Sequence, residues 1–225
     1  MWQELREELH PRGLEVVTVA LDTDGDSPLR WIEQAKPSHP SLIDRAHAVA
    51  ELLGIVNVPS GVWIDEAGTF VRPPETAYPR RPGFLDREIP ADATSERARA
   101  IAVTRKLRID AERYVAALRD WVERGAASPF ALAPAEVVRR SRPRPPEAAL
   151  AATHFELAQH LFRAGRSDAA IPHFQEAQRL APDNWGYKRQ AWQLAGSEAR
   201  RVYGTTWLDE VLRIGAENYY PPLEL

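Results

Sequence analysis

A proline-led hairpin, in a chain that contains no cysteine, is the feature that most constrains the fold. The step Val58-Pro59 leads into the apolar run Val62–Ile64, which is followed by the turn-forming residues Asp65–Gly68 and by a second apolar run from Thr69. This order is typical of a strand, a tight turn and a strand. An X-Pro step is also the only one at which a cis peptide bond is inexpensive. The sequence therefore predicts a β-hairpin entered through a proline.

The segments before the hairpin alternate between strand and helix patterns. Residues 15–21 form a short β-branched run of the kind found in buried parallel strands, and residues 22–26 form a turn. Residues 27–36 predict a helix with Ser27 as its cap and Pro28 at its first position. After the short segment 39–44, a second helix is expected to end at Gly54. The order predicts an α/β domain.

With its hairpin, this order resembles the TlpA/ResA-like and AhpC/TSA-type redoxin domains of the thioredoxin-like fold, over residues 1–75. The resemblance implies that Pro59 follows a cis peptide bond, and that Val58 and Pro59 position a substrate chain beside redox-active cysteines. It implies thiol-disulfide or peroxide chemistry for the family. Because this chain has no cysteine, no catalytic residue is assigned and no such activity is expected of it.

The family's Cys-x-x-Cys motif and the strand before it have no counterpart here. Residues 1–9 read as the end of the helix that would begin with the motif. The missing strand would lie between the strands predicted at 16–21 and 62–64, whose edges would then carry unpaired backbone groups. Three outcomes are open: the two strands pair directly, a partner donates a strand, or the natural gene product is longer. We favour the third, and we expect an open gap to produce a homodimer or aggregate.

Composition limits the function further. Of the 225 residues 44% are hydrophobic and 27% are charged, as in ordinary water-soluble domains, and no run approaches a membrane span. With no signal-like start, the expected location is cytoplasmic. Residues 1–92 carry 16 acidic and 9 basic residues, whereas an Arg/Pro-rich stretch at 138–146 is basic. No aromatic interleaving or nucleic-acid module accompanies it, so we interpret it as a solvated linker rather than a nucleic-acid contact.

The second half is predicted to be helical. A long helix is expected over 94–125, within a connecting segment at 93–127, and the linker covers 128–147. Residues 148–225 form the last domain. Within it, small and apolar residues match the 34-residue spacing of a tetratricopeptide (TPR) repeat, and the segment resembles that family. They are Leu157, Ala158, Leu161, Gly165, Ala170, Phe174, Ala177 and Pro182.

A second stripe on the repeat consists of Phe155, Gln159 and Phe162. It is distinct from the packing residues, so it predicts a protein- or peptide-binding groove, with contact to the long helix as the alternative. The fold class expected overall is an incomplete thioredoxin-like α/β domain followed by an all-α TPR-like region.

No pattern in the sequence calls for a metal or a cofactor. The acidic residues Asp22, Asp24, Asp26 and Glu33 have calcium-loop spacing, but Ser27 stands where that loop requires glycine. The six histidines show no ligand spacing. Two functions stay open: a redoxin whose cysteines are encoded upstream, and a non-catalytic protein-binding scaffold that uses the TPR groove. The partner, the electron donor and the oligomeric state are not encoded in these patterns.

Overall fold

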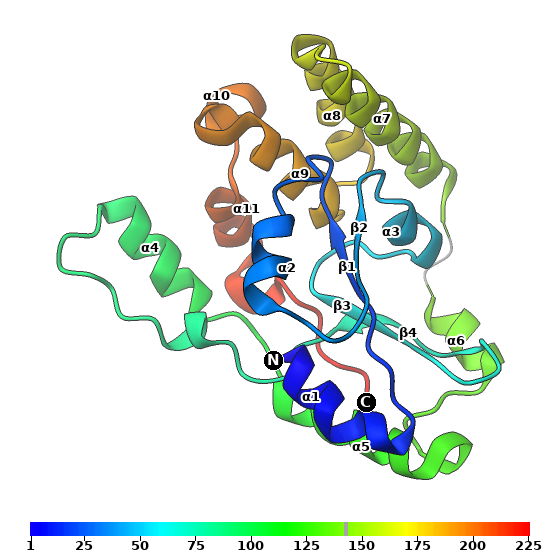
Figure 1. The fold of residues 1–225 in the computed structure, drawn as a ribbon. Helices are drawn as coiled ribbons and strands as arrows, with labels where there is room; N and C mark the ends of the chain where they lie inside the picture. The colour runs from blue at the N-terminus through cyan, green and yellow to red at the C-terminus, as the bar shows by residue number, and fades with distance from the viewer. Residues whose placement is uncertain (142–143) are drawn as a thin grey trace.

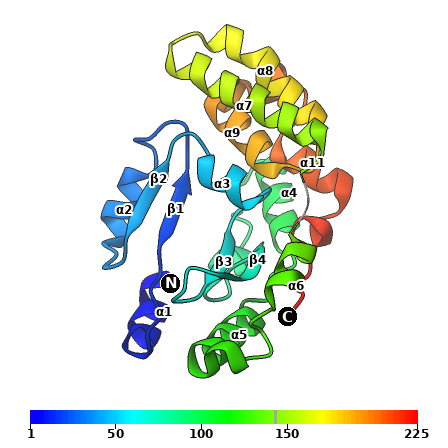
Figure 2. The same cartoon turned by 90° about the vertical axis from the view of Figure 1, so that its right-hand side faces the viewer.

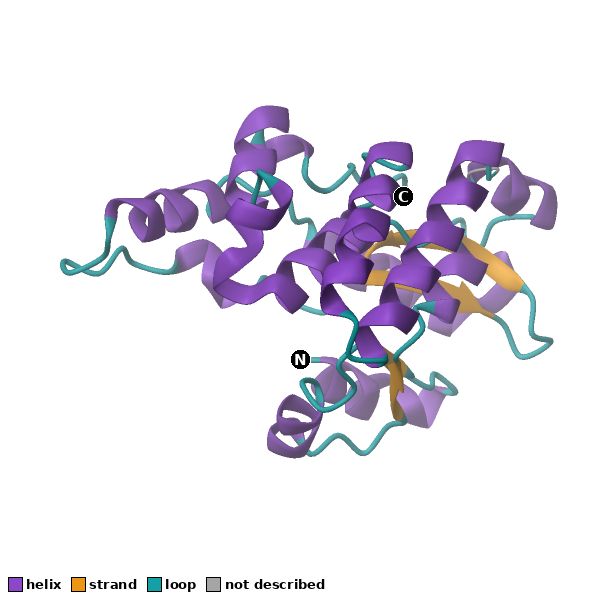
Figure 3. Ribbon diagram, turned by 90° about the horizontal axis from the view of Figure 1, so that it is seen from above, coloured by secondary structure: helices purple, strands orange, loops and turns teal. Residues whose placement is uncertain are grey.

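A computed structural model describes residues 1–141 and 144–225 (Figure 1). The N-terminal part mixes helices and strands, and the regular elements described after it are all helices (Figure 3). Four sequence predictions are confirmed: the helix over the first nine residues, the first strand, the helix that ends at Gly54, and the hairpin. In chain order the N-terminal elements are α1 (Trp2–Leu9), β1 (Thr18–Leu21), α2 (Leu29–Ala35), β2 (Ser41–Asp44), α3 (Ala48–Leu53), β3 (Ser60–Ile64) and β4 (Phe70–Thr76).

The four strands form two separate sheets. β1 pairs with β2 in parallel, from Thr18 opposite Ser41 to Leu21 opposite Asp44. β3 pairs with β4 in an antiparallel hairpin whose turn contains Gly68 at a φ of 79°. Among the described residues β1 and β3 do not pair with each other. Of the three outcomes for the gap, direct pairing of the two flanking strands is therefore not the one observed.

Two strand assignments differ from the sequence expectations. Residues 41–44, expected as a lead-in segment, form the strand β2. β4 continues through Pro73 and Pro74, beyond the apolar run that begins at Thr69. Proline lacks the N–H that a central strand needs but is tolerated at sheet edges and irregularities. β4 is an edge strand, and the register of the hairpin shifts near Trp63.

The expected long helix over 94–125 is two helices, α4 (Ser95–Thr104) and α5 (Ala111–Arg124). The break occurs because Asp110 caps a new helix: its carboxylate accepts a hydrogen bond from the Arg113 amide at 3.2 Å. Leu107, which lies in the break between the two helices, is buried.

The expected linker at 128–147 contains the helix α6 (Pro134–Arg140), which begins with a proline at a position where no N–H is needed. Arg142 and Pro143, in the Arg/Pro-rich stretch, lie outside the described residues. α7 begins within the linker as well. The remaining helices are α7 (Pro146–Arg163), α8 (Ser167–Leu180), α9 (Trp185–Ala195), α10 (Ala199–Tyr203) and α11 (Trp207–Ile214).

Buried apolar side chains gather in three clusters. One lies between α7, α8 and α9, where small alanines allow close helix packing. A second joins α4, α9 and α11 to the segments around Tyr78 and Tyr220. The third joins α1 and α5 to the β3–β4 hairpin. None of these clusters includes a residue of β1, α2, β2 or α3, although all four elements are fully described. The β1–β2 unit is therefore the least covered part of the fold.

Candidate functional site

The edge of β1 that faces away from β2 has no strand partner in the described chain. In a parallel pair of strands, every second residue forms its hydrogen bonds with the same neighbouring strand. On the β2 side, the Thr18 amide donates to Pro40 O at 3.0 Å and the Asp22 amide donates to Asp44 O at 3.4 Å. Val19 and Leu21 therefore direct their N–H and C=O groups to the opposite edge. Figure 2 shows that β1 is the strand of its pair that lies nearer to the hairpin. The unpaired edge is thus on the side of β1 toward the hairpin, and we call the two edges that β1 and β3 present toward each other the strand slot.

Apolar side chains around the strand slot are exposed. Val19 and Leu42 are paired and so share one face of the β1–β2 sheet, and Val17 continues that face by alternation. Val17 and Leu42 are each 54% exposed, and Ile64 at the end of β3 is 47% exposed. An edge with unpaired backbone groups and exposed apolar residues is the arrangement that another strand can complete.

The predicted substrate-binding pair Val58 and Pro59 lies directly before β3, and the Val58–Pro59 peptide bond is cis. Both residues are half-buried. The Val58 amide donates to the side chain of Asn57 at 2.9 Å, and the Val58 carbonyl accepts from the Tyr220 hydroxyl at 3.2 Å. The backbone groups of Val58 are therefore already engaged by the chain itself.

The predicted protein-binding stripe is brought together, but two of its members are covered. Phe155 is buried and stacks on Tyr187 with ring centroids 4.2 Å apart. Gln159 is buried as well, and Phe162 is half-buried against the same cluster. Phe155 and Gln159 contact the N-terminal α/β part. They do not contact the predicted long helix, which was the alternative to a binding groove. In this conformation the expected groove is filled by the chain's own segments.

A polar network joins the helical region to the loops after β1 and β2. The Gln159 carbonyl oxygen accepts from the Thr23 hydroxyl at 2.9 Å, and its amide donates to Ala46 O at 3.4 Å. Gln190 Oε1 accepts from the Thr23 amide at 3.0 Å and lies 2.9 Å from His47 Nε2. Because Gln190 Oε1 can only accept, His47 carries its proton on Nε2.

Burial lowers the pKa of His47, since the charged form loses its hydration. The sequence shows no ligand spacing around His47, and it did not identify this network. Its partners are more than 110 residues apart in the chain, and single polar residues in loops carry no periodic signal that would reveal such contacts.

No metal centre is indicated by the residues that the structure describes, where no group of three His, Asp or Glu side chains could hold an ion. The carboxylates of Asp22 and Asp24 accept from backbone amides two residues ahead, which makes this acidic segment a turn. Within the described ranges, no helix has the length and apolar character needed to cross a membrane.

No protein-family model, no curated protein and no solved structure matches this chain.

Proposed function

We propose that the chain is a protein-binding module in which an extended strand from a partner enters the strand slot and joins the two small sheets into one. The observation that supports this most strongly is the pair of edges, one on β1 and one on β3, that have no strand partner among the described residues and lie on neighbouring sheets. One inserted strand would pair with both edges and give a continuous five-stranded sheet. Main-chain hydrogen bonds would supply affinity, and alternate side chains would supply selectivity.

The thioredoxin-like character of the N-terminal part belongs to the same proposal. A parallel β1–α2–β2 unit precedes a helix and a proline-led hairpin, which is the order that the sequence resemblance implies. The TPR-like pair α7–α8 then serves as a support for this layer, because Gln159 holds the loops after β1 and β2. In this arrangement the helical region presents the α/β part rather than binding a separate peptide through Phe155.

Redox chemistry is the second candidate, and the position of Val58-Pro59 directly before β3, as the sequence resemblance implies, favours it. The chain itself supplies no thiol. Thiol-disulfide exchange would require cysteines on the strand that occupies the slot or next to it. This candidate therefore depends on the same strand insertion as the first.

The edges allow a matched pair of proline variants. Val19→Pro removes an N–H from the edge of β1 that faces the slot, whereas Ile43→Pro removes one from the outer edge of β2. By the alternation of the ladder neither N–H bonds between β1 and β2, and edge positions tolerate proline. We expect peptides selected from a random library for binding to the chain to have alternating apolar residues, and to lose most of their affinity for Val19→Pro.

The same peptides should bind Ile43→Pro as they bind the unmodified chain, as measured by fluorescence anisotropy. Circular dichroism and thermal melting would show that both variants stay folded. Equal loss of affinity in the two variants, or full affinity in Val19→Pro, would show that the peptides do not enter the strand slot.

A further inference from the structure

The last residues of the chain lie extended on the side of the hairpin that faces away from β1 (Figure 2). We call residues 219–225 the C-terminal segment. Leu223 and Leu225 are half-buried against the cluster of α1, α5 and the hairpin, whereas Pro221, Pro222 and Glu224 are exposed. Over residues 222–225 exposed and half-buried side chains alternate, as in an extended chain with one face against the protein.

Side-chain donors hold the C-terminal segment by its carbonyl oxygens. Residues 220–225 form no backbone-to-backbone hydrogen bond with any residue that the structure describes. Instead, the donors come from the loop before β3, from β4, from α5 and from α6. Asn57 donates to Tyr219 O at 3.1 Å, Arg72 to Glu224 O at 3.1 Å, Arg140 to Glu224 O at 2.7 Å, and Arg113 to Leu223 O at 3.4 Å and to Leu225 O.

These hydrogen bonds go to backbone oxygens, so sequence selectivity depends mainly on two apolar side chains. Carbonyl oxygens are common to every peptide, so donors that bind them accept any extended segment of suitable shape. Selectivity then depends on the half-buried Leu223 and Leu225 and on the proline pair before them, which favours an extended backbone at low entropic cost.

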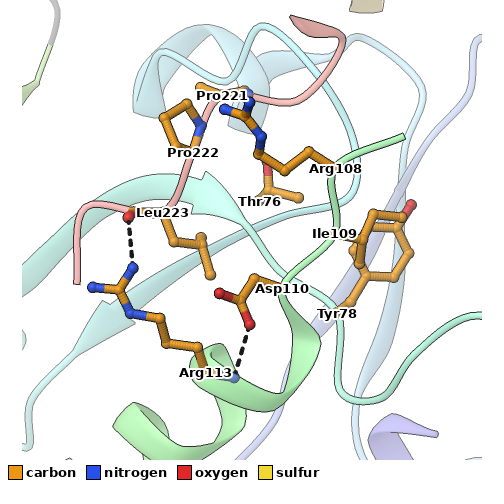
Figure 4. A pocket seen from close by; sticks show the side chains of 9 residues that line it. All are labelled: Thr76, Tyr78, Arg108, Ile109, Asp110, Arg113, Pro221, Pro222 and Leu223. Atoms are coloured by element: carbon orange, nitrogen blue, oxygen red, sulfur yellow. Dashed lines mark hydrogen bonds between the residues drawn. The ribbon is translucent and has the colours of Figure 1, made fainter. Parts of the chain in front are cut away.

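A cavity of about 100 Å³ lies beneath the segment (Figure 4). The end of β4 and the start of α5 form its floor, and the proline pair and Leu223 form its cover. A segment that belonged to the hydrophobic core would fill such a space, because unfilled space loses packing contacts. The residues that line the cavity are Thr76, Tyr78, Arg108, Ile109, Asp110, Arg113, Pro221, Pro222 and Leu223.

We propose that this groove is a second peptide-binding site and that the C-terminal segment is its internal ligand. Its external ligand is an extended segment of a partner protein in which a proline pair precedes two leucines separated by one residue. The tethered segment competes at a high effective concentration, so the partner binds when the segment is displaced. The site is separate from the strand slot and does not depend on the function proposed above.

The test uses a chain that ends at Tyr220 and a fluorescent peptide with the sequence of the removed residues 221–225. Tyr219 and Tyr220 are retained because both are buried in a core cluster. Fluorescence anisotropy measures the binding, and we expect the peptide to bind the shortened chain saturably. Binding to the intact chain should be at least about tenfold weaker, because the chain's own segment competes for the groove. A peptide with aspartate in place of both leucines should not bind.

Neighbouring arginines on α6 provide a matched control. In the shortened chain Arg140→Ala should weaken peptide binding by about tenfold, the equivalent of one charged hydrogen bond. Arg139→Ala should leave binding unchanged, because the Arg139 side chain pairs with Glu136 and is exposed. Failure of a folded shortened chain to bind, equal binding by the intact chain, or equal effects of the two variants would overturn the proposal.

Two further measurements cover the remaining outcomes. If the shortened chain does not fold, carboxypeptidase digestion of the full-length variants replaces it: faster release of Leu225 from Arg140→Ala than from Arg139→Ala supports a displaceable segment, and equal rates contradict it. Sedimentation of the intact chain tests whether the groove is occupied by the C-terminal segment of a second copy of this chain. A dimer that the peptide dissociates would overturn the assignment to a partner protein.

Discussion

Replacing Arg72 with methionine is expected to lower the free energy of unfolding by about 3–5 kcal/mol, the usual cost of removing one partner of a buried ion pair. The Arg72 side chain is only 2% exposed and forms two hydrogen bonds with the Glu75 carboxylate, at 2.6 and 3.0 Å. It also donates to the carbonyl oxygens of Phe130 and Glu224 and lies over the ring of Trp63. Methionine fills a similar volume but leaves the Glu75 carboxylate and both carbonyls without their donor.

Urea denaturation measures this change, and Arg81→Met is the control. Arg81 forms an ion pair of similar geometry with Asp86, but both side chains are more than half exposed, so little change is expected there. If the two variants were equally stable, the buried network of Arg72 would not be what fixes β4 to the rest of the fold.

Phe155→Ala is the second large effect and is expected to cost about 3–5 kcal/mol. Phe155 is 1% exposed and contacts the rings of Tyr187, Phe174 and His47, with centroid distances of 4.2, 5.7 and 5.1 Å. Its removal would open a cavity where α7, α8 and α9 meet the loop that carries His47. Thermal and urea unfolding both report the loss.

Leu157→Ala, on the same helix, is the control. Leu157 is 40% exposed, so its truncation should cost less than about 1 kcal/mol. If Phe155→Ala were as stable as Leu157→Ala, the burial of Phe155 in this cluster would be contradicted. Because Phe155→Ala is expected to destabilise the whole chain, Phe162 is the member of the stripe to vary when peptide binding is measured.

The parts of the fold that the sequence predicts are those with local signals. The hairpin follows from a proline, an apolar run and a turn that ends at Gly68, and α3 ends at Gly54, which has the left-handed conformation expected there. Short-range patterns also predict α1 and the helix pair α7–α8. In each case, neighbouring residues supply both the element and its end.

The differences come from partners that are distant in the chain. Ser41–Asp44 become a strand because β1 lies beside them, and four residues that follow a proline give no such indication alone. The apolar face over 94–125 continues past a point where Asp110 starts a new helix. Phe155 and Gln159 have a periodicity that fits a groove or an internal interface equally well, and only the position of the N-terminal loops decides between them.

The candidate site was predicted in outline. The absence of a strand between residues 16–21 and 62–64 indicated two edges without a partner, and the structure keeps β1 and β3 in separate sheets. The polar network around Gln190 and the contacts of the C-terminal segment were not predictable. They depend on single donors and acceptors that long-range packing brings together.

Amide hydrogen exchange of β1, resolved by NMR, tests the open strand slot most directly. In the ladder with β2 the amides of Ala20 and Asp22 are bonded, whereas those of Val19 and Leu21 face the slot. We expect the Val19 and Leu21 amides to exchange at least about tenfold faster than the Ala20 amide, because they need no opening of a hydrogen bond. Equal protection of all four amides would show that the edge of β1 is already paired and would contradict the account.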